Sequence, residues 1–119
     1  MLKRLVAASL FLALSGLGAQ AASCVVTEFS LQAPGGVQVA KMPPLVTPQN
    51  ITVTGTSAQS SALSGDTKMI RAWCDTQSAI EIGANPTASA TVSTPLSAGL
   101  AEYFNVDPTG QKVAFILRP

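Results

Sequence analysis

The sequence predicts an all-β protein, a small antiparallel β-sandwich or Greek-key barrel of about seven strands, preceded by an N-terminal signal-like helix. Two observations predict this fold. Short runs in which apolar and polar residues alternate recur along the chain, and segments rich in Pro, Gly, Ser and Thr separate them. After the N-terminal segment, no stretch repeats its apolar residues with the period of about 3.6 that marks an amphipathic helix.

Residues 1–21 match the pattern of a secretory signal peptide. Lys3 and Arg4 form a short basic segment, and an apolar run follows them. Ala19 and Ala21 are the small residues that signal peptidase requires before its cut. We therefore expect a signal peptide or hydrophobic leader over residues 1–21 and a single β-sandwich domain over residues 22–119.

The apolar run of this leader is short for a membrane span. It covers about 15 residues, whereas a helix that crosses a bilayer needs roughly 20. A cleaved leader therefore fits better than a stable membrane anchor. A lipoprotein cut before Cys24 is a further alternative, but the residues before it lack the large aliphatic side chain that such a site usually carries.

Cleavage after Ala21 would leave 98 of the 119 residues, enough for one two-layer core. The leader holds two of the seven basic residues, so five remain against six acidic residues. This nearly neutral balance provides no basic surplus for binding nucleic acid.

The chain offers little for catalysis. It contains no histidine, which removes the usual general base and the commonest metal ligand. The six carboxylates are scattered, and the glycines form no phosphate-binding pattern. An enzyme would need the fold to gather two of these carboxylates. We expect no enzymatic activity, no catalytic residue, no metal site and no cofactor.

Residues 67–86 are the stretch around which the predicted fold is organised. Two successive strands joined by a polar turn at residues 75–78 predict an antiparallel hairpin. In the second strand, Ile80 and Ile82 share one face and leave Glu81 on the other. The first strand divides into two sets of side chains, Ile70, Ala72 and Cys74 against Met69, Arg71 and Trp73.

Alternation and turn residues place the other expected strands at residues 24–31, 37–42, 50–55, 99–106 and 112–117. The last of these is apolar on both sides, which indicates either a central strand or an edge that docks onto a partner. Phe104 and Val106 are expected in the core. The polar segments at residues 54–65 and 85–98 predict long connections of the Greek-key kind.

The first of these strands has one apolar face by its alternation. The residues on that face are Val25, Thr27, Phe29 and Leu31, with Val26, Glu28 and Ser30 on the other side.

Cys24 and Cys74 are the two cysteines of the chain. In an oxidising compartment they could form a disulfide that closes a loop of about 50 residues and contributes roughly 3 to 4 kcal/mol. The alternative is that Cys74 is a small core residue and Cys24 a free thiol near the chain end.

Three residues are candidates for an interface. Arg71 is expected on the outward face of its strand beside Trp73, opposite to the side of Ile70, Ala72 and Cys74. There it could pair with a carboxylate of a partner and stack on the indole, or else pack against Glu81 or Glu102 as an ordinary surface charge. Trp73 could anchor a partner or a sugar, or fill the core if the strand is turned over. The same two interpretations apply to Tyr103.

The order of several short motifs resembles a group of small proteins from tailed bacteriophages and prophages. The resemblance covers more than half of the chain that follows the leader. It is carried by residues 55–60, Thr67 with residues 70–72, residues 82–88, Leu96 with residues 98–99, residues 102–104 with Val106, and residues 110–116.

This resemblance implies an all-β virion structural component, with a small capsid-associated or decoration-like role and no enzymatic activity. Its partners would be proteins, either other copies of this chain in a homo-oligomer or a capsid lattice. Arg71 and the corner at residues 83–86 would shape the sheet and its partner surface. The leader departs from this pattern, since capsid components assemble without export. The expected location is the virion, or otherwise the periplasm or the extracellular space.

A second hypothesis belongs to a different class of protein. The chain could be an exported binding module for a glycan or a cell-surface ligand, with Trp73 or Tyr103 as its platform. A structure in which both rings were buried would remove this hypothesis.

Overall fold

The computed structural model describes residues 21–30, 42–107 and 110–119. These residues form strands and loops and contain no helix, which confirms the predicted all-β class. The expected leader helix, and all but the last residue of the strand expected at residues 37–42, lie outside the described residues. The strands are β1 (Ala22–Phe29), β2 (Gln49–Val53), β3 (Ala58–Gln59), β4 (Met69–Cys74), β5 (Ser78–Gly83), β6 (Thr94–Leu96), β7 (Ala101–Asn105) and β8 (Lys112–Leu117).

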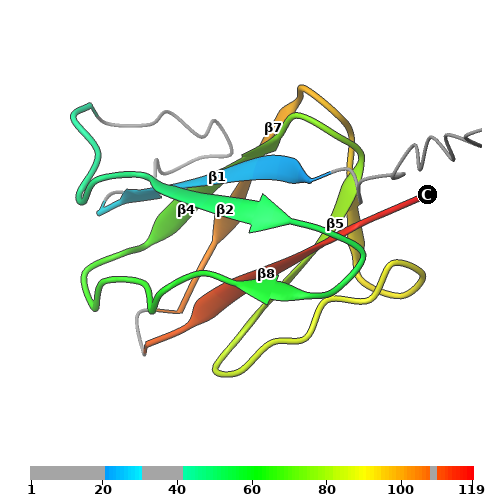
Figure 1. Ribbon diagram of the computed structural model, residues 1–119. Helices are drawn as coiled ribbons and strands as arrows, with labels where there is room; N and C mark the ends of the chain where they lie inside the picture. Colours follow the sequence, from blue (N-terminus) through cyan, green and yellow to red (C-terminus); the bar gives the residue numbers. More distant parts are fainter. Residues whose placement is uncertain (1–20, 31–41, 108–109) are drawn as a thin grey trace, which may run out of the picture.

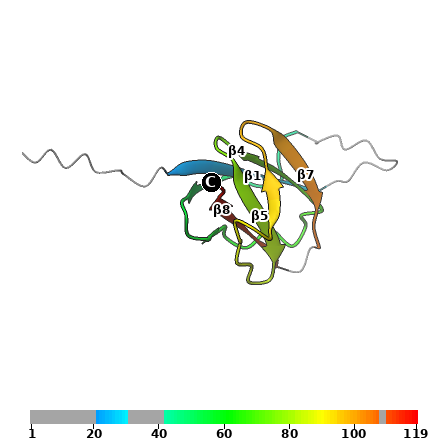
Figure 2. The ribbon, with the colours of Figure 1, turned by 90° about the vertical axis from the view of Figure 1, so that its right-hand side faces the viewer.

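The strands are arranged in two antiparallel sheets of four (Figure 1). The first sheet has the order β2-β1-β4-β7 and the second the order β3-β8-β5-β6. Figure 2 shows β7 at one side of the molecule, where it forms an edge of the first sheet. β8 lies between β3 and β5, so the last strand is central, which was one of the two predicted positions.

The hairpin predicted for residues 67–86 is wrong. β4 pairs with β1 and β7, whereas β5 pairs with β6 and β8 in the other sheet. The polar residues between them continue the pairing of β4 with β1, because the amide of Asp75 donates to the carbonyl oxygen of Ser23 at 3.0 Å. The chain therefore passes from one sheet to the other at this point and does not fold back in the same sheet.

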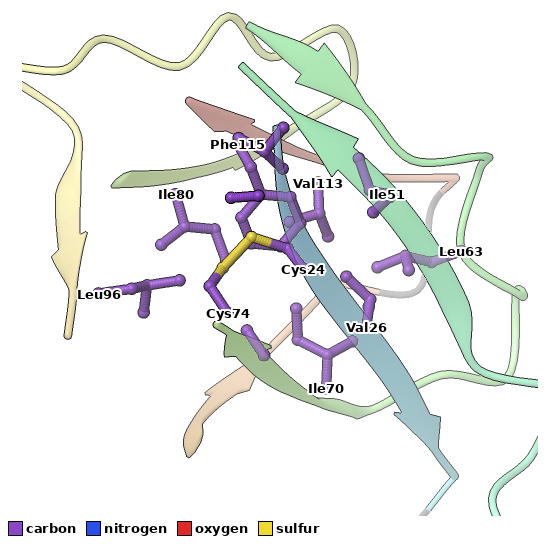
Figure 3. Packing of buried hydrophobic residues seen from close by; sticks show 13 residues of the cluster. Cys24, Val26, Ile51, Leu63, Ile70, Cys74, Ile80, Leu96, Val113 and Phe115 are labelled. Carbon is purple, nitrogen blue, oxygen red and sulfur yellow. A yellow bond between two sulfur atoms is a disulfide. The ribbon is translucent and has the colours of Figure 1, made fainter. Parts of the chain in front are cut away.

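One cluster of apolar side chains fills the space between the sheets (Figure 3). As expected, Ile70, Ala72 and Cys74 point into it from β4, and Phe104 and Val106 pack against it. Ile80 and Phe115 contribute from the second sheet and are 2% and 0% exposed. Side chains from both layers share this core, so the two sheets stabilise each other by burying apolar surface.

The expected orientation of the first strand is wrong. Cys24 and Val26 belong to the core cluster, so the set with Val25 and Thr27 points away from it. Both sides of the end of β1 are buried, because Phe29 is only 2% exposed on the outward side. Alternation could not distinguish the two sides, since each set carries apolar side chains.

The structure contains two short strands that sequence patterning missed. β3 and β6 lie within the segments expected to be connections. The amide of Ser60 donates to the carbonyl oxygen of Val113 at 2.7 Å, and the amide of Val113 donates to the Ser60 hydroxyl at 2.9 Å. β6 contains Pro95, which is tolerated because this strand forms an edge of its sheet.

The connection between β5 and β6 is attached to the second sheet by side-chain hydrogen bonds. The Gln59 amide group of β3 donates to the Asn85 side-chain oxygen at 2.9 Å and to the Pro86 carbonyl oxygen at 2.7 Å. The Ser93 hydroxyl donates to the Glu81 carboxylate at 2.8 Å. Gln59 and Glu81 are both in register with Ala114 of β8, so they share its outward side.

This connection covers the middle of the outward side of the second sheet. Ala79 and Ala114 point away from the core cluster, yet both are 0% exposed. The second sheet therefore uses its outward side to hold its own chain. The first sheet is also covered over part of its outward side, where Phe29 and Met69 are 2% and 0% exposed, and the residues around Arg71 on that side are half-buried.

Candidate functional site

The structure brings the three predicted interface residues together on the outward side of the first sheet. Arg71 of β4 lies directly opposite Tyr103 of β7, and Trp73 lies opposite Ala101. Residues paired across antiparallel strands project from the same side of the sheet. Because Ile70 and Ala72 point into the core, this side is the one that faces away from it.

β1 extends the same surface on the other side of β4. Val25 is in register with Trp73, and Thr27 with Arg71. We call the outward-facing group formed by Val25, Thr27, Arg71, Trp73, Ala101 and Tyr103 the Arg71 face. Thr27 is buried and the other five residues are half-buried.

Neither Glu81 nor Glu102, the neighbours expected if Arg71 were an ordinary surface charge, lies beside it. Glu81 belongs to the second sheet, and Glu102 is in register with Ala72, which points into the core. Within the described part of the chain, no hydrogen bond or ion pair involves the Arg71 guanidinium. No fully buried side-chain nitrogen or oxygen among the described residues lacks a partner, so this unpaired guanidinium is reached by solvent.

The Arg71 face has one charge. The other outward residues of β2, β1, β4 and β7 are neutral, and all four strands lie within the described part of the chain. One interpretation placed Trp73 in the core, but it does not belong to the core cluster. Trp73 and Tyr103 are both half-buried. The face therefore combines one guanidinium with two accessible aromatic rings.

A disulfide lies directly behind this face. Cys24 and Cys74 are paired across β1 and β4 with a Cα–Cα distance of 4.1 Å, and their sulfur atoms are bonded. Both cysteines are 0% exposed and belong to the core cluster (Figure 3). This covalent link joins the two strands that carry Val25 and Trp73, so it limits how far the strands under the face can separate.

Hydrogen bonds of Asp75 join β1 and β4 at the end of the sheet that carries the disulfide. The Asp75 carboxylate accepts from the amide of Ser23 at 3.0 Å, in addition to the backbone bond between these residues. The carboxylate also accepts from the Thr76 hydroxyl at 3.1 Å. Asp75 thus holds the ends of β1 and β4 together and is engaged in structure.

Sequence reasoning missed a buried carboxylate. Glu28 is 2% exposed, and one carboxylate oxygen accepts from the Thr67 hydroxyl at 2.6 Å and from the Ser64 amide at 2.7 Å. The signal was its position on the same side of β1 as Cys24 and Val26, which the correct strand orientation places inward. Its bonds attach the segment before β4 to β1, which is a structural role.

The described residues hold no candidate metal centre. None of them form a group of three or more His, Cys, Asp or Glu side chains that could hold a metal ion. A hollow of about 480 Å³ is lined by residues 43–48, which are three prolines with Leu45, Val46 and Thr47 and carry no titratable side chain. No helix in the described part of the chain could cross a membrane.

Comparisons of the chain with protein-family models, with curated proteins and with solved structures found no match.

Proposed function

We propose that this chain is a non-enzymatic β-sandwich protein of phage origin, a small virion-associated or capsid decoration component that works by oligomerising or by docking on a protein lattice. The observation that carries the proposal is the Arg71 face. Among the described residues it presents one guanidinium without a hydrogen-bond or ion-pair partner, beside the half-buried Trp73 and Tyr103. Arg, Trp and Tyr are the residues that dominate the binding energy of protein interfaces.

The distribution of covered and open surface supports the same proposal. The connection between β5 and β6 covers part of the outward side of the second sheet, and the first sheet carries a disulfide directly behind the half-buried residues of the Arg71 face. Binding to a rigid surface costs less ordering entropy than binding to a flexible one. The order of short motifs that resembles small proteins of tailed phages adds the virion to this proposal.

Particle composition tests the proposal. The strain that carries the gene would be induced to release phage particles, and particles purified on a density gradient would be analysed by mass spectrometry. We expect peptides of this chain in the particle fraction at a constant ratio to the capsid protein. Their absence from particles, with the protein present in the periplasm or the medium, would contradict the proposal.

The buried disulfide favours a second candidate function. Disulfides persist mainly in oxidising compartments, so the link between Cys24 and Cys74 agrees with an exported binding module that uses Trp73 and Tyr103 to hold a glycan. A glycan array with the purified protein tests this candidate. Binding that Trp73→Ala removes would support it, and an array without signal would remove it.

A further inference from the structure

We propose that the Arg71 face binds a carboxylate of a different protein, an Asp or Glu side chain set within an apolar surface, and does not pair with its own copy. This inference rests on the proposed docking function and names the chemistry of the partner. It follows from the charges on the face and from what surrounds Arg71.

The immediate surroundings of Arg71 favour a single carboxylate. Its neighbours in register are Thr27 and Tyr103, and its neighbours along β4 on the same side are Met69 and Trp73. None of these side chains carries a charge, and the described residues give the guanidinium no polar partner. A planar guanidinium pairs with a carboxylate through two parallel hydrogen bonds and is the residue best suited to such a pair at an interface.

The same charge distribution disfavours a symmetric dimer through this face. A two-fold axis would place the Arg71 face of one copy on the Arg71 face of the other. The outward residues of the four strands include no carboxylate, and the carboxylate of Asp75 just beyond β4 already accepts from the Ser23 amide and the Thr76 hydroxyl, so the two guanidinium groups would approach without a free opposite charge between them. Like charges brought together at an interface select against a partner.

A nucleic acid or a membrane surface fits this face less well. Both present many phosphates, and binding to them is built from several Lys and Arg side chains acting together. The Arg71 face has one such side chain. A lone cation with Tyr103 opposite it and Trp73 next on the same side of β4 instead matches one anionic group attached to an apolar body.

Phenylacetate is a suitable probe because it joins one carboxylate to one apolar ring. Trp73 is the only tryptophan of the chain, so its indole N–H gives one NMR signal from within the face. We expect phenylacetate to shift this signal with a dissociation constant of about 1–10 mM, and neutral phenylacetamide to bind about tenfold more weakly at equal ionic strength.

Variants assign the effect to Arg71. Arg71→Gln is expected to weaken phenylacetate binding about tenfold, and Arg71→Lys less, because lysine keeps the charge and loses the planar fork. Arg118→Gln is the matched control, since Arg118 lies away from the Arg71 face and donates to the Ala90 carbonyl oxygen in the connection between β5 and β6. It should bind phenylacetate as the wild type does.

Three results would overturn the inference. These are an indole signal that phenylacetate does not move, binding that survives Arg71→Gln, and phenyl phosphate binding tenfold or more tighter than phenylacetate. Sedimentation velocity of the same sample adds a fourth, a dimer that Arg71→Gln strengthens or dissolves. If the chain is found in particles but phenylacetate fails, the docking function stands and only the partner chemistry falls.

Discussion

Cys24 and Cys74 face each other across β1 and β4 with 4.1 Å between their Cα atoms, and their bond lies in the core directly beneath Val25 and Trp73. The two bonded cysteines and the first two residues of the Arg71 face, Val25 and Trp73, thus lie on the same two strands. Stability and the shape of the face are coupled at this point.

Removing the disulfide should cost much of the stability of so small a domain. The bond joins residues 50 apart, and the chain-entropy model assigns such a loop about 4 kcal/mol. We expect the double variant Cys24→Ala with Cys74→Ala to lose about this amount of unfolding free energy in a urea titration. A loss under about 1 kcal/mol would contradict a structural role for the bond.

The buried carboxylate of Glu28 should be sensitive to the loss of its oxygens. Glu28→Ala leaves the Thr67 hydroxyl and the Ser64 amide without their acceptor and should cost about 2–3 kcal/mol. Glu28→Gln keeps one oxygen acceptor and nearly the same shape, so it should cost about 1 kcal/mol. Urea unfolding of both variants checks the order, and equal losses would argue against these bonds.

The backbone at Gly99 should resist a side chain. Its φ of 74° lies in the left-handed region, and its amide donates to the Cys74 carbonyl oxygen at 2.8 Å. A Cβ there would meet nothing within 4 Å, so the cost of Gly99→Ala comes from the backbone alone, about 1–2 kcal/mol. Gly55→Ala has the same open space without positive φ and should stay within about 0.5 kcal/mol.

Phe115 should be the most costly aromatic side chain to truncate. It is 0% exposed in the cluster between the sheets, and Phe115→Ala should lose about 3–5 kcal/mol. Val92 is 85% exposed, so Val92→Ala should change the unfolding free energy by less than about 0.5 kcal/mol. Thermal unfolding followed by circular dichroism would separate the two, and similar midpoints would contradict the assigned core.

Local alternation was sufficient for the fold class and for several of the strands. Lys112–Leu117 was predicted with the bounds that the structure has, and the inward set of β4 was correct. Strand pairing could not be predicted from alternation, because a short polar turn can either close a hairpin or connect two strands of different sheets. The contact between Asp75 and Ser23, which decides the matter, joins residues 52 apart.

The candidate site was predictable in its members and not in its geometry. Arg71, Trp73 and Tyr103 were identified by residue type, yet their assembly into one face depends on β7 pairing with β4. The expected neighbours Glu81 and Glu102 failed for the same reason, since sequence distance does not reveal the sheet or the side on which a residue lies. Glu28 was missed because the first strand carries apolar residues on both sides.

The most direct test of the Arg71 face is its binding to phage particles that lack this chain. Purified wild-type protein and the double variant Arg71→Gln with Trp73→Ala would be sedimented with such particles, after circular dichroism had shown the same fold in both. We expect the wild type to sediment with the particles and the variant to stay in solution. Equal sedimentation of the two proteins would contradict the central role of this face.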